Sequence, residues 1–411
     1  MLELIKLEMK KLCRRKLTII VTVCGFLATV LFFSLPFLQF LAWDQDGNML
    51  SRSEAIEYRH KCYDSISGEI TEERVTQDLK EYQEKRNNPD NIIIEKDGEV
   101  TFTDEVFFGY LSPRSSYMDM LGNTYIPNQL GHNNITKIDL TNGADFYNTR
   151  NEMVKNLITN NYDLTESEKE YWLDKNEKIN EPYEYGYALG WSSFGDTAVM
   201  LIISILGICI ALASVFANEY QAGTDAVILS TRYGKSKIIY AKIITSFVFA
   251  TAVFTVNAIT ALAIPLITRG ADGANLPLQI MDTTIPYPLT FLQATLIIIG
   301  IAYAVMLGLV SITLLCSAKM KTAFPVLIID VLFIFIPIFL KPGSNALWNR
   351  IAWLLPYNSM SGLSIFKEYL SYPTGITVLS VISMIIILYL GITFIMLPLA
   401  GRGFKKHQVN R

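Results

Sequence analysis

The chain has 411 residues, of which 51% are hydrophobic and 18% charged, and its formal net charge is −3 at pH 7. Its apolar residues gather in six long, nearly uncharged runs, and about 20 apolar residues suffice to cross a hydrocarbon core of about 30 Å. Every backbone amide in lipid must be satisfied within its own segment, so these runs predict helices and exclude a soluble globular protein. The runs are residues 17–43, 197–217, 238–267, 289–316, 322–340 and 374–400.

Residues 1–16 are basic and precede the first apolar run. They contain six Lys and Arg, while Leu2, Ile5 and Met9 recur at helical spacing. This pattern is typical of an amphipathic elbow helix lying on an anionic membrane surface, and a plain extension of the first span is the alternative. The run that follows exceeds the roughly 7–15 residues of a signal-peptide core, which predicts a retained first transmembrane helix at 17–43.

Residues 44–193 form an acidic block with 29 Asp and Glu against 15 Lys and Arg, whereas the rest of the chain has 9 acids and 20 bases. Apolar runs on either side of Asp97-Gly98 predict a β-hairpin, and flanking helical patterns make the block an expected α+β domain. Thr165, with Glu168 three residues later, is a helix-capping signal. The expected helices are residues 51–63, 69–87, 144–160 and 165–180.

No enzyme site or metal site stands out in this block. The three histidines of the chain lie far apart and lack Cys or His neighbours at metal-ligand spacing. The acid pairs Glu72-Glu73 and Asp104-Glu105 are expected to be solvated surface. Cys62 is the only cysteine of the block, which excludes an internal disulfide and leaves a disulfide between two copies open.

Basic residues set the expected orientation through the positive-inside rule. They concentrate before the first run, between the second and third, near residues 318–321 and in the tail, whereas the alternate loops have fewer. The sequence therefore predicts a polytopic α-helical membrane protein of a bacterial plasma membrane, with six transmembrane helices and both termini cytoplasmic. The α+β domain between helices 1 and 2 is expected to be extracytoplasmic.

The loop between the second and third runs reads FANEYQAGTDAVILSTRYGKSK, residues 216–237. It ends in Gly234-Lys235-Ser236, the last part of a phosphate-binding loop, but that motif needs a glycine where this chain has Leu229. The chain also lacks a cytoplasmic segment long enough for a nucleotide-binding domain. We expect no ATPase activity, no enzyme activity and no cofactor in this chain.

This loop resembles that of the membrane subunits of ABC-2 type (type V) ABC exporters. The resemblance covers residues 1–43 and 194–411, the permease core, and leaves out the acidic domain. In the family, a Glu is followed by a Gly-Thr pair, a Leu-Ser/Thr segment, basic residues and a Lys that opens the third span. The positions that fit this pattern, within and just after the expected coupling segment 218–237, are Glu219, Gly223, Thr224, Leu229, Ser230, Thr231, Lys235 and Lys242. Arg232 is also an expected coupling residue, but with Tyr233 it stands where many members have a proline, so we expect the local bend to differ from theirs.

The resemblance implies an exporter subunit that works as a dimer, with a second copy or a paralogue. A dimer of ABC ATPase subunits, which carry ATP and Mg, would dock on the coupling segment, with Glu219 available for charge pairing. The alternative is an ordinary positive-inside loop. The family also places re-entrant helices at the segment that is residues 341–372 here, and its aromatic residues suit a membrane interface.

Polar residues within the apolar runs are candidates for the translocation path. Asp330 stands at membrane depth, where a lone ionisable group is costly unless paired or neutralised. One hypothesis is that Asp330 lines the substrate path or relays a proton. The alternative is that it is a protonated or hydrogen-bonded packing residue. Asn257 and Gln293 are weaker candidates that are as readily explained by contacts between helices.

The sequence leaves the substrate open among lipids, antimicrobial or other peptides and ions. Membrane lipid is an expected partner and nucleic acid is not. Two other classes also stay open. One is a membrane sensor whose residues 44–193 bind a ligand, and the other is an ATP-independent carrier, although no inverted repeat is evident.

Overall fold

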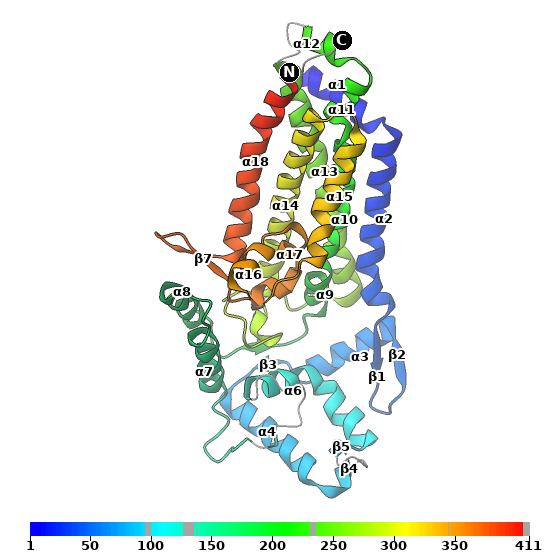
Figure 1. Cartoon of the computed structure of the whole chain (residues 1–411). Coiled ribbons are helices and arrows are strands. Elements are labelled where there is room, and N and C mark those ends of the chain that lie inside the picture. The colour runs from blue at the N-terminus through cyan, green and yellow to red at the C-terminus, as the bar shows by residue number, and fades with distance from the viewer. Residues whose placement is uncertain (95–99, 126–134, 137, 231–235, 344, 406–411) are drawn as a thin grey trace.

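The computed structural model describes residues 1–94, 100–125, 135–136, 138–230, 236–343 and 345–405. Long helices run side by side as a bundle, and most of the polar segment that follows α2 lies at one end of it (Figure 1). Helix α1 (Leu2–Cys13), the short helix α12 (Asp225–Ser230) and the end of α18 (Val381–Lys405) lie at the opposite end (Figure 1).

Within the described residues, five helices are long and apolar enough to cross a membrane. A sixth apolar helix, α15, has 17 residues, which is about 25 Å at 1.5 Å per residue and less than the hydrocarbon thickness. Five of the six expected spans are thus confirmed by length and composition. The five are α2 (Lys16–Leu38), the continuous segment Leu189–Gln221, α13 (Lys237–Arg269), α14 (Phe291–Lys319) and α18, and the shorter helix is α15 (Ala323–Phe339).

Two spans were predicted too long. The first ends at Leu38 because residues 41–43 form strand β1 (Leu41–Trp43), which pairs antiparallel with β2 (Met49–Ser51). The Asp44 carboxylate closes that turn by accepting backbone N–H bonds at 3.0 and 2.8 Å. The last span begins at Val381 because strands β7 (Ser371–Pro373) and β8 (Val378–Ser380) form a hairpin before it.

The segment Leu189–Gln221 lies at the centre of the bundle. Of its apolar window 67% is buried, compared with 22% for α2 and 28% for α18, which border the bundle. Gly362 approaches it so closely that a Cβ there would lie 1.8 Å from the carbonyl oxygen of Gly195. The segment consists of α9 (Leu189–Thr197), η4 (Ala198–Met200), α10 (Leu201–Leu212) and α11 (Ser214–Gln221).

The insert after α2 contains the expected helices, and the capping box of Thr165 and Glu168 is formed. The expected hairpin appears as two paired strands, but its Asp97-Gly98 turn lies outside the described residues. Helix α6 and the π-helix η2 before it were not predicted. The insert elements are α3 (Arg52–Asp64), β3 (Gly68–Glu69), α4 (Glu72–Asn87), η1 (Pro89–Asn91), β4 (Ile92–Ile94), β5 (Val100–Phe102), α5 (Asp104–Val106), η2 (Phe107–Leu111), α6 (Ser112–Tyr125), α7 (Phe146–Thr159), α8 (Glu166–Glu177) and β6 (Glu184–Tyr185), with β3 and β6 paired antiparallel.

The core of the insert is aromatic. Tyr82, Phe146 and Trp172 are fully buried, and desolvation by burial raises the pKa of Tyr82 to about 12. Cys62 is 7% exposed and free, and burial raises the pKa of its thiol. A disulfide between two copies, which the sequence left open, therefore has no accessible thiol in this structure.

Arg150 of α7 attaches the insert to the connection between α13 and α14. Its side chain is fully buried, and its Nε donates to the Thr283 carbonyl at 2.8 Å. One Nη donates to the Ile285 carbonyl at 3.2 Å and the other to the Asn176 side chain at 2.5 Å. The charge is thus distributed over acceptors from two segments, which fixes α7 against the bundle.

Glu168 of α8 attaches the insert to the segment between α15 and α18. Its fully buried carboxylate accepts from Arg350 at 2.9 and 3.1 Å and from the Ser371 hydroxyl at 2.9 Å. Trp172 also donates to Ser371, at 3.2 Å. The segment that receives α8 consists of short pieces, as its interrupted apolar pattern predicts: α16 (Ala346–Ala352), α17 (Pro356–Ser359) and η6 (Gly362–Lys367).

We expect Arg150→Leu to destabilise the protein by about 3 kcal/mol, because it leaves buried carbonyl and amide acceptors without their donor. Thermal unfolding in mild detergent, followed by circular dichroism and by limited proteolysis of the insert, measures the effect. Lys155→Leu makes the same change on the exposed face of α7 and is the matched control. Equal unfolding temperatures for the two variants would contradict an anchoring role of Arg150.

Candidate functional site

Helix α11 ends in a hydrogen-bonded turn made by Gly223 and Thr224. Gly223 has a φ of +65°, which glycine adopts without strain, and its N–H donates to the Tyr220 carbonyl at 3.1 Å. The N–H of Thr224 donates to the Glu219 carbonyl at 2.9 Å. These two bonds form a Schellman motif, which stops the helix and redirects the chain into α12.

The carboxylate of Glu219 lies at the centre of a buried ionic cluster. Its side chain is 3% exposed, and its Oε1 contacts Lys242 Nζ at 2.8 Å and also the Nζ of Lys11. Lys242 is fully buried and reaches Glu8 at 2.8 Å and the Val215 carbonyl at 3.3 Å, so its three donors have three acceptors. Two acids and two bases thus join α1, α11 and α13.

The expectation that Glu219 is available for charge pairing with a partner is wrong in this structure. Its Oε1 is shared by two ammonium groups, and its Oε2 accepts from the Thr224 hydroxyl at 2.5 Å. A carboxylate this buried is retained only when its charge is paired and its lone pairs are occupied. Glu219 therefore positions the turn and the elbow helix α1, and its carboxylate does not reach solvent.

Helices α14 and α18 support the other side of α11. The Ser317 hydroxyl of α14 accepts from the backbone N–H of Phe216 at 3.0 Å and donates to the Ala213 carbonyl at 2.7 Å. The Tyr220 hydroxyl donates to the Ala318 carbonyl at 2.8 Å. Rings of Phe216 and Tyr220 pack on Phe404 near the end of α18. Helix α11 is thereby held by α14 and α18 on this side and by α1 and α13 on the other, while the turn that follows it is exposed.

Helix α12 begins with the buried Asp225, at 6% exposure, and the residues on either side of that position are exposed or partly exposed. Gly223, Thr224 and Ser230 are exposed, and Val227 is 66% exposed despite its apolar side chain. Leu229 lies within α12. The other expected coupling residues, Thr231, Arg232 and Lys235, lie outside the described residues.

Asp330 of α15 faces α14 and is 4% exposed. The Thr313 hydroxyl lies 2.9 Å from Asp330 Oδ1 and 3.0 Å from the Leu309 carbonyl, and one hydroxyl hydrogen serves only one of these acceptors. Oδ2 of Asp330 has no hydrogen-bond partner among the described residues. The geometry suits a protonated Asp330 whose Oδ1–H donates to the Thr313 hydroxyl, while that hydroxyl donates to the Leu309 carbonyl. Oδ2 of Asp330 is then the unsatisfied oxygen.

The two weaker path candidates have structural positions. Asn257 is 2% exposed and bonds the Thr29 hydroxyl at 2.7 Å, which confirms the interpretation of a contact between helices. Gln293 lies at the start of α14, where its side chain accepts from the Thr290 N–H at 3.1 Å in a capping box. The three candidates are therefore not brought together at one site.

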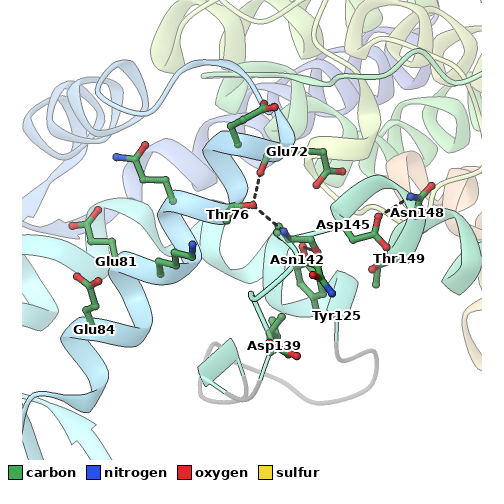
Figure 2. A pocket seen from close by; sticks show the side chains of 16 residues that line it. Glu72, Thr76, Glu81, Glu84, Tyr125, Asp139, Asn142, Asp145, Asn148 and Thr149 are labelled. Carbon is green, nitrogen blue, oxygen red and sulfur yellow. Dashed lines mark hydrogen bonds between the residues drawn. The ribbon is translucent and has the colours of Figure 1, made fainter.

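A separate open groove of about 1280 Å³ lies in the insert. Glu81 and Glu84 border it from α4, and Asp139 and Asp145 belong to the segment that leads to α7 (Figure 2). Glu72 also lines the groove, but its carboxylate accepts the N–H groups of the first two residues of α7 at 2.8 and 2.9 Å. The expectation that Glu72 is merely solvated is wrong, because it caps α7.

The sequence did not predict that Lys242 pairs with Glu8 or that Lys11 pairs with Glu219. The available signal was an acidic residue, Glu8, in a strongly basic amphipathic helix, together with a lysine one turn inside an apolar run. Buried charges need opposite partners, so a lysine inside an apolar run predicts an acidic partner elsewhere in the chain. In the described part of the chain, no three His, Cys, Asp or Glu side chains are placed to hold a metal ion.

Long apolar helices and a basic end built around a fixed helix turn define a multi-pass membrane protein. Comparison with protein families matches residues 2–408 to the ABC-2 family transporter proteins. The chain belongs to this family and is a membrane subunit of an ABC transporter, without a catalytic role of its own. The match includes the insert, which the sequence resemblance left out. Comparisons with curated proteins and with solved structures found no significant match.

We expect Glu219→Gln and Lys242→Met each to destabilise the protein by about 3 kcal/mol, since each leaves a buried charge with one partner fewer. The double variant is expected to cost clearly less than the sum of the two, because the groups interact directly. Thermal unfolding of all three in mild detergent measures the coupling. The exposed pair Glu3–Lys6, changed in the same way, should show little effect. Additive losses in the buried cycle would contradict the direct pairing.

Proposed function

We propose that this chain is the transmembrane subunit of an ATP-driven exporter. Two copies, or one copy and a paralogue, form the pathway, and two ATPase subunits supplied in trans bind ATP and Mg. The family supports a membrane subunit of an ABC transporter. Beyond the family, we propose that the direction of transport is export, that the subunit works as a dimer and that residues 218–237 couple it to the ATPase.

The observation that carries this proposal is the rigid turn beneath the exposed helix α12. A partner that binds α12 pushes on a Schellman turn and an ionic cluster that hold α11 to α1 and α13. Helix α11 is the end of a continuous 33-residue segment, Leu189–Gln221, which reaches the other side of the bundle. Movement at α12 is thereby transmitted along the central helix.

The charge distribution supports the orientation. Basic residues in the last turns of α1, α14 and α18 and Lys237 at the start of α13 gather where α12 projects, whereas Arg269 ends α13 on the side of the acidic insert (Figure 1). The positive-inside rule makes the α12 side cytoplasmic and the insert extracytoplasmic. We place the protein in a bacterial cell membrane with both termini inside.

A lipid, a peptide, including an antimicrobial peptide, or an ion suits an exporter of this kind. The acidic groove of the insert favours a cationic ligand by charge alone. The same groove also supports a second candidate function, a membrane sensor in which the insert binds a ligand and the α12 region contacts a signalling partner.

Purification of the chain from its native host in mild detergent should yield a stoichiometric soluble ATPase and measurable ATP hydrolysis. Gly223→Val should abolish this association, because a β-branched residue at φ +65° is strained by roughly 1–2 kcal/mol and reorients α12.

Gly391→Val is the matched control, since a Cβ at either glycine meets no atom within 4 Å and only Gly223 has a positive φ. An ATPase that stays bound to Gly223→Val would contradict coupling through this turn. The absence of any ATPase under several gentle conditions would instead favour the sensor.

Asp330→Asn should lower transport in vesicles without lowering the unfolding temperature. Asparagine has the same size and can still bond Thr313, but it cannot take up or release a proton. Thr313→Val removes the hydrogen bond and keeps the carboxyl, so it separates loss of the contact from loss of the carboxyl group. Unchanged transport by Asp330→Asn would remove Asp330 from the translocation path.

A further inference from the structure

A second cavity, of about 720 Å³, lies where α2 enters the insert. This volume is within the roughly 300–1000 Å³ that is usual for small-molecule sites. Its wall is largely aromatic and aliphatic, with a few polar groups on one side. The apolar lining is Phe40, Leu41, Ala42, Trp43, Phe107, Phe108 and Leu111, and the polar lining is Arg59, Ser112, Ser115 and Asp119.

The cavity continues the surface that α2 presents to lipid. Leu31 and Leu38 of α2 are 53% and 47% exposed, and Leu41 and Trp43 of the following strand are 48% and 47% exposed. Only 22% of the apolar window of α2 is buried, so most of this helix is open to lipid. A tryptophan at the end of a span is typical of the membrane–water interface. The mouth of the cavity is therefore at the depth of the lipid headgroups.

The shape of the cavity is built into the fold. A π-helix, η2 (Phe107–Leu111), interrupts the start of α6, and such segments are frequent at functional sites. The ring of Phe107 lies 5.1 Å from that of Phe108, and the β1–β2 turn rests on Phe108 at Gly47. Arg59 spans part of the polar side and donates to the Ser112 carbonyl at 3.0 Å. The walls thus come from four elements, β1, α3, η2 and α6.

We propose that this cavity binds one acyl chain of a lipid from the adjacent leaflet of the bilayer. The chain enters beside Trp43 and lies against Phe107 and Phe108, while its headgroup stays at the interface. The apolar lining matches a hydrocarbon chain, and continuity with the lipid-facing side of α2 gives the chain a route without passage through water. This site is independent of the direction of transport and of the ATPase.

The test uses the full chain in phosphatidylcholine nanodiscs and a lysophosphatidylcholine whose acyl chain is brominated, which quenches nearby tryptophan. Subtracting the quenching seen in Trp43→Phe from that of the native chain gives the quenching of Trp43 alone. As probe is added, this Trp43 quenching should saturate at one acyl chain per protein. Ser115→Phe, which fills the cavity, should weaken that saturable quenching by at least about tenfold. Ser116→Phe, at the exposed neighbouring position of α6, should leave it unchanged. Ser112→Leu fills the cavity from another position and should act like Ser115→Phe.

Trp43 quenching that rises linearly with the probe in the native chain would overturn the proposal, because Trp43 would then only face bulk lipid. Saturable quenching that persists in both Ser115→Phe and Ser112→Leu would also overturn it, provided their unfolding temperatures match that of the native chain. ATPase association is not part of the readout, so the result does not depend on the proposed exporter function.

Discussion

The buried contact between Glu219 and Lys242 is the constraint on which the α12 end of the molecule depends. Lys242 is fully buried, so its charge requires acceptors, and the structure supplies them from α1 and α11 at once. If helix α1 left the bundle, Lys242 would lose Glu8 as one of its acceptors and its buried charge would be incompletely paired. The elbow helix is therefore held by charge as well as by its apolar side.

Polar contacts between distant segments tie together both ends of a bundle whose helices are mostly apolar. Arg150 and Glu168 attach the insert to the connections before α14 and before α18, while the Glu219 cluster ties α11 to its neighbours. Apolar side chains give little preference among positions along a helix when lipid is the alternative environment. Directional hydrogen bonds can fix how neighbouring helices are positioned along their axes. The ones described here lie near the ends of the spans. The central segment Leu189–Gln221 links the two sets of polar contacts.

The sequence predicted those features that depend on local patterns. Apolar runs located five long helices, and the Thr165–Glu168 signal located the start of α8. Helix α6 was missed because Pro113 and Gly122 weaken its helical pattern, and its burial comes from contacts with distant segments. In the candidate site, Glu219, Gly223 and Thr224 were selected through the family resemblance, but the inward orientation of the Glu219 carboxylate was not predicted. That orientation depends on Lys242 and Glu8, which are remote in the chain.

An ionic cluster suits this position better than an apolar contact would. A buried pair contributes little net stability compared with well-packed apolar residues, but separating it is costly. The ionic cluster instead restricts the relative positions of the helices, because each ammonium and carboxylate group must keep its partners. On the proposed coupling role, a force on α12 would act on α11, α1 and α13 together. Rigid transmission of this kind requires the glycine turn as well, since its backbone bonds join the exposed helix to the Glu219 carbonyl.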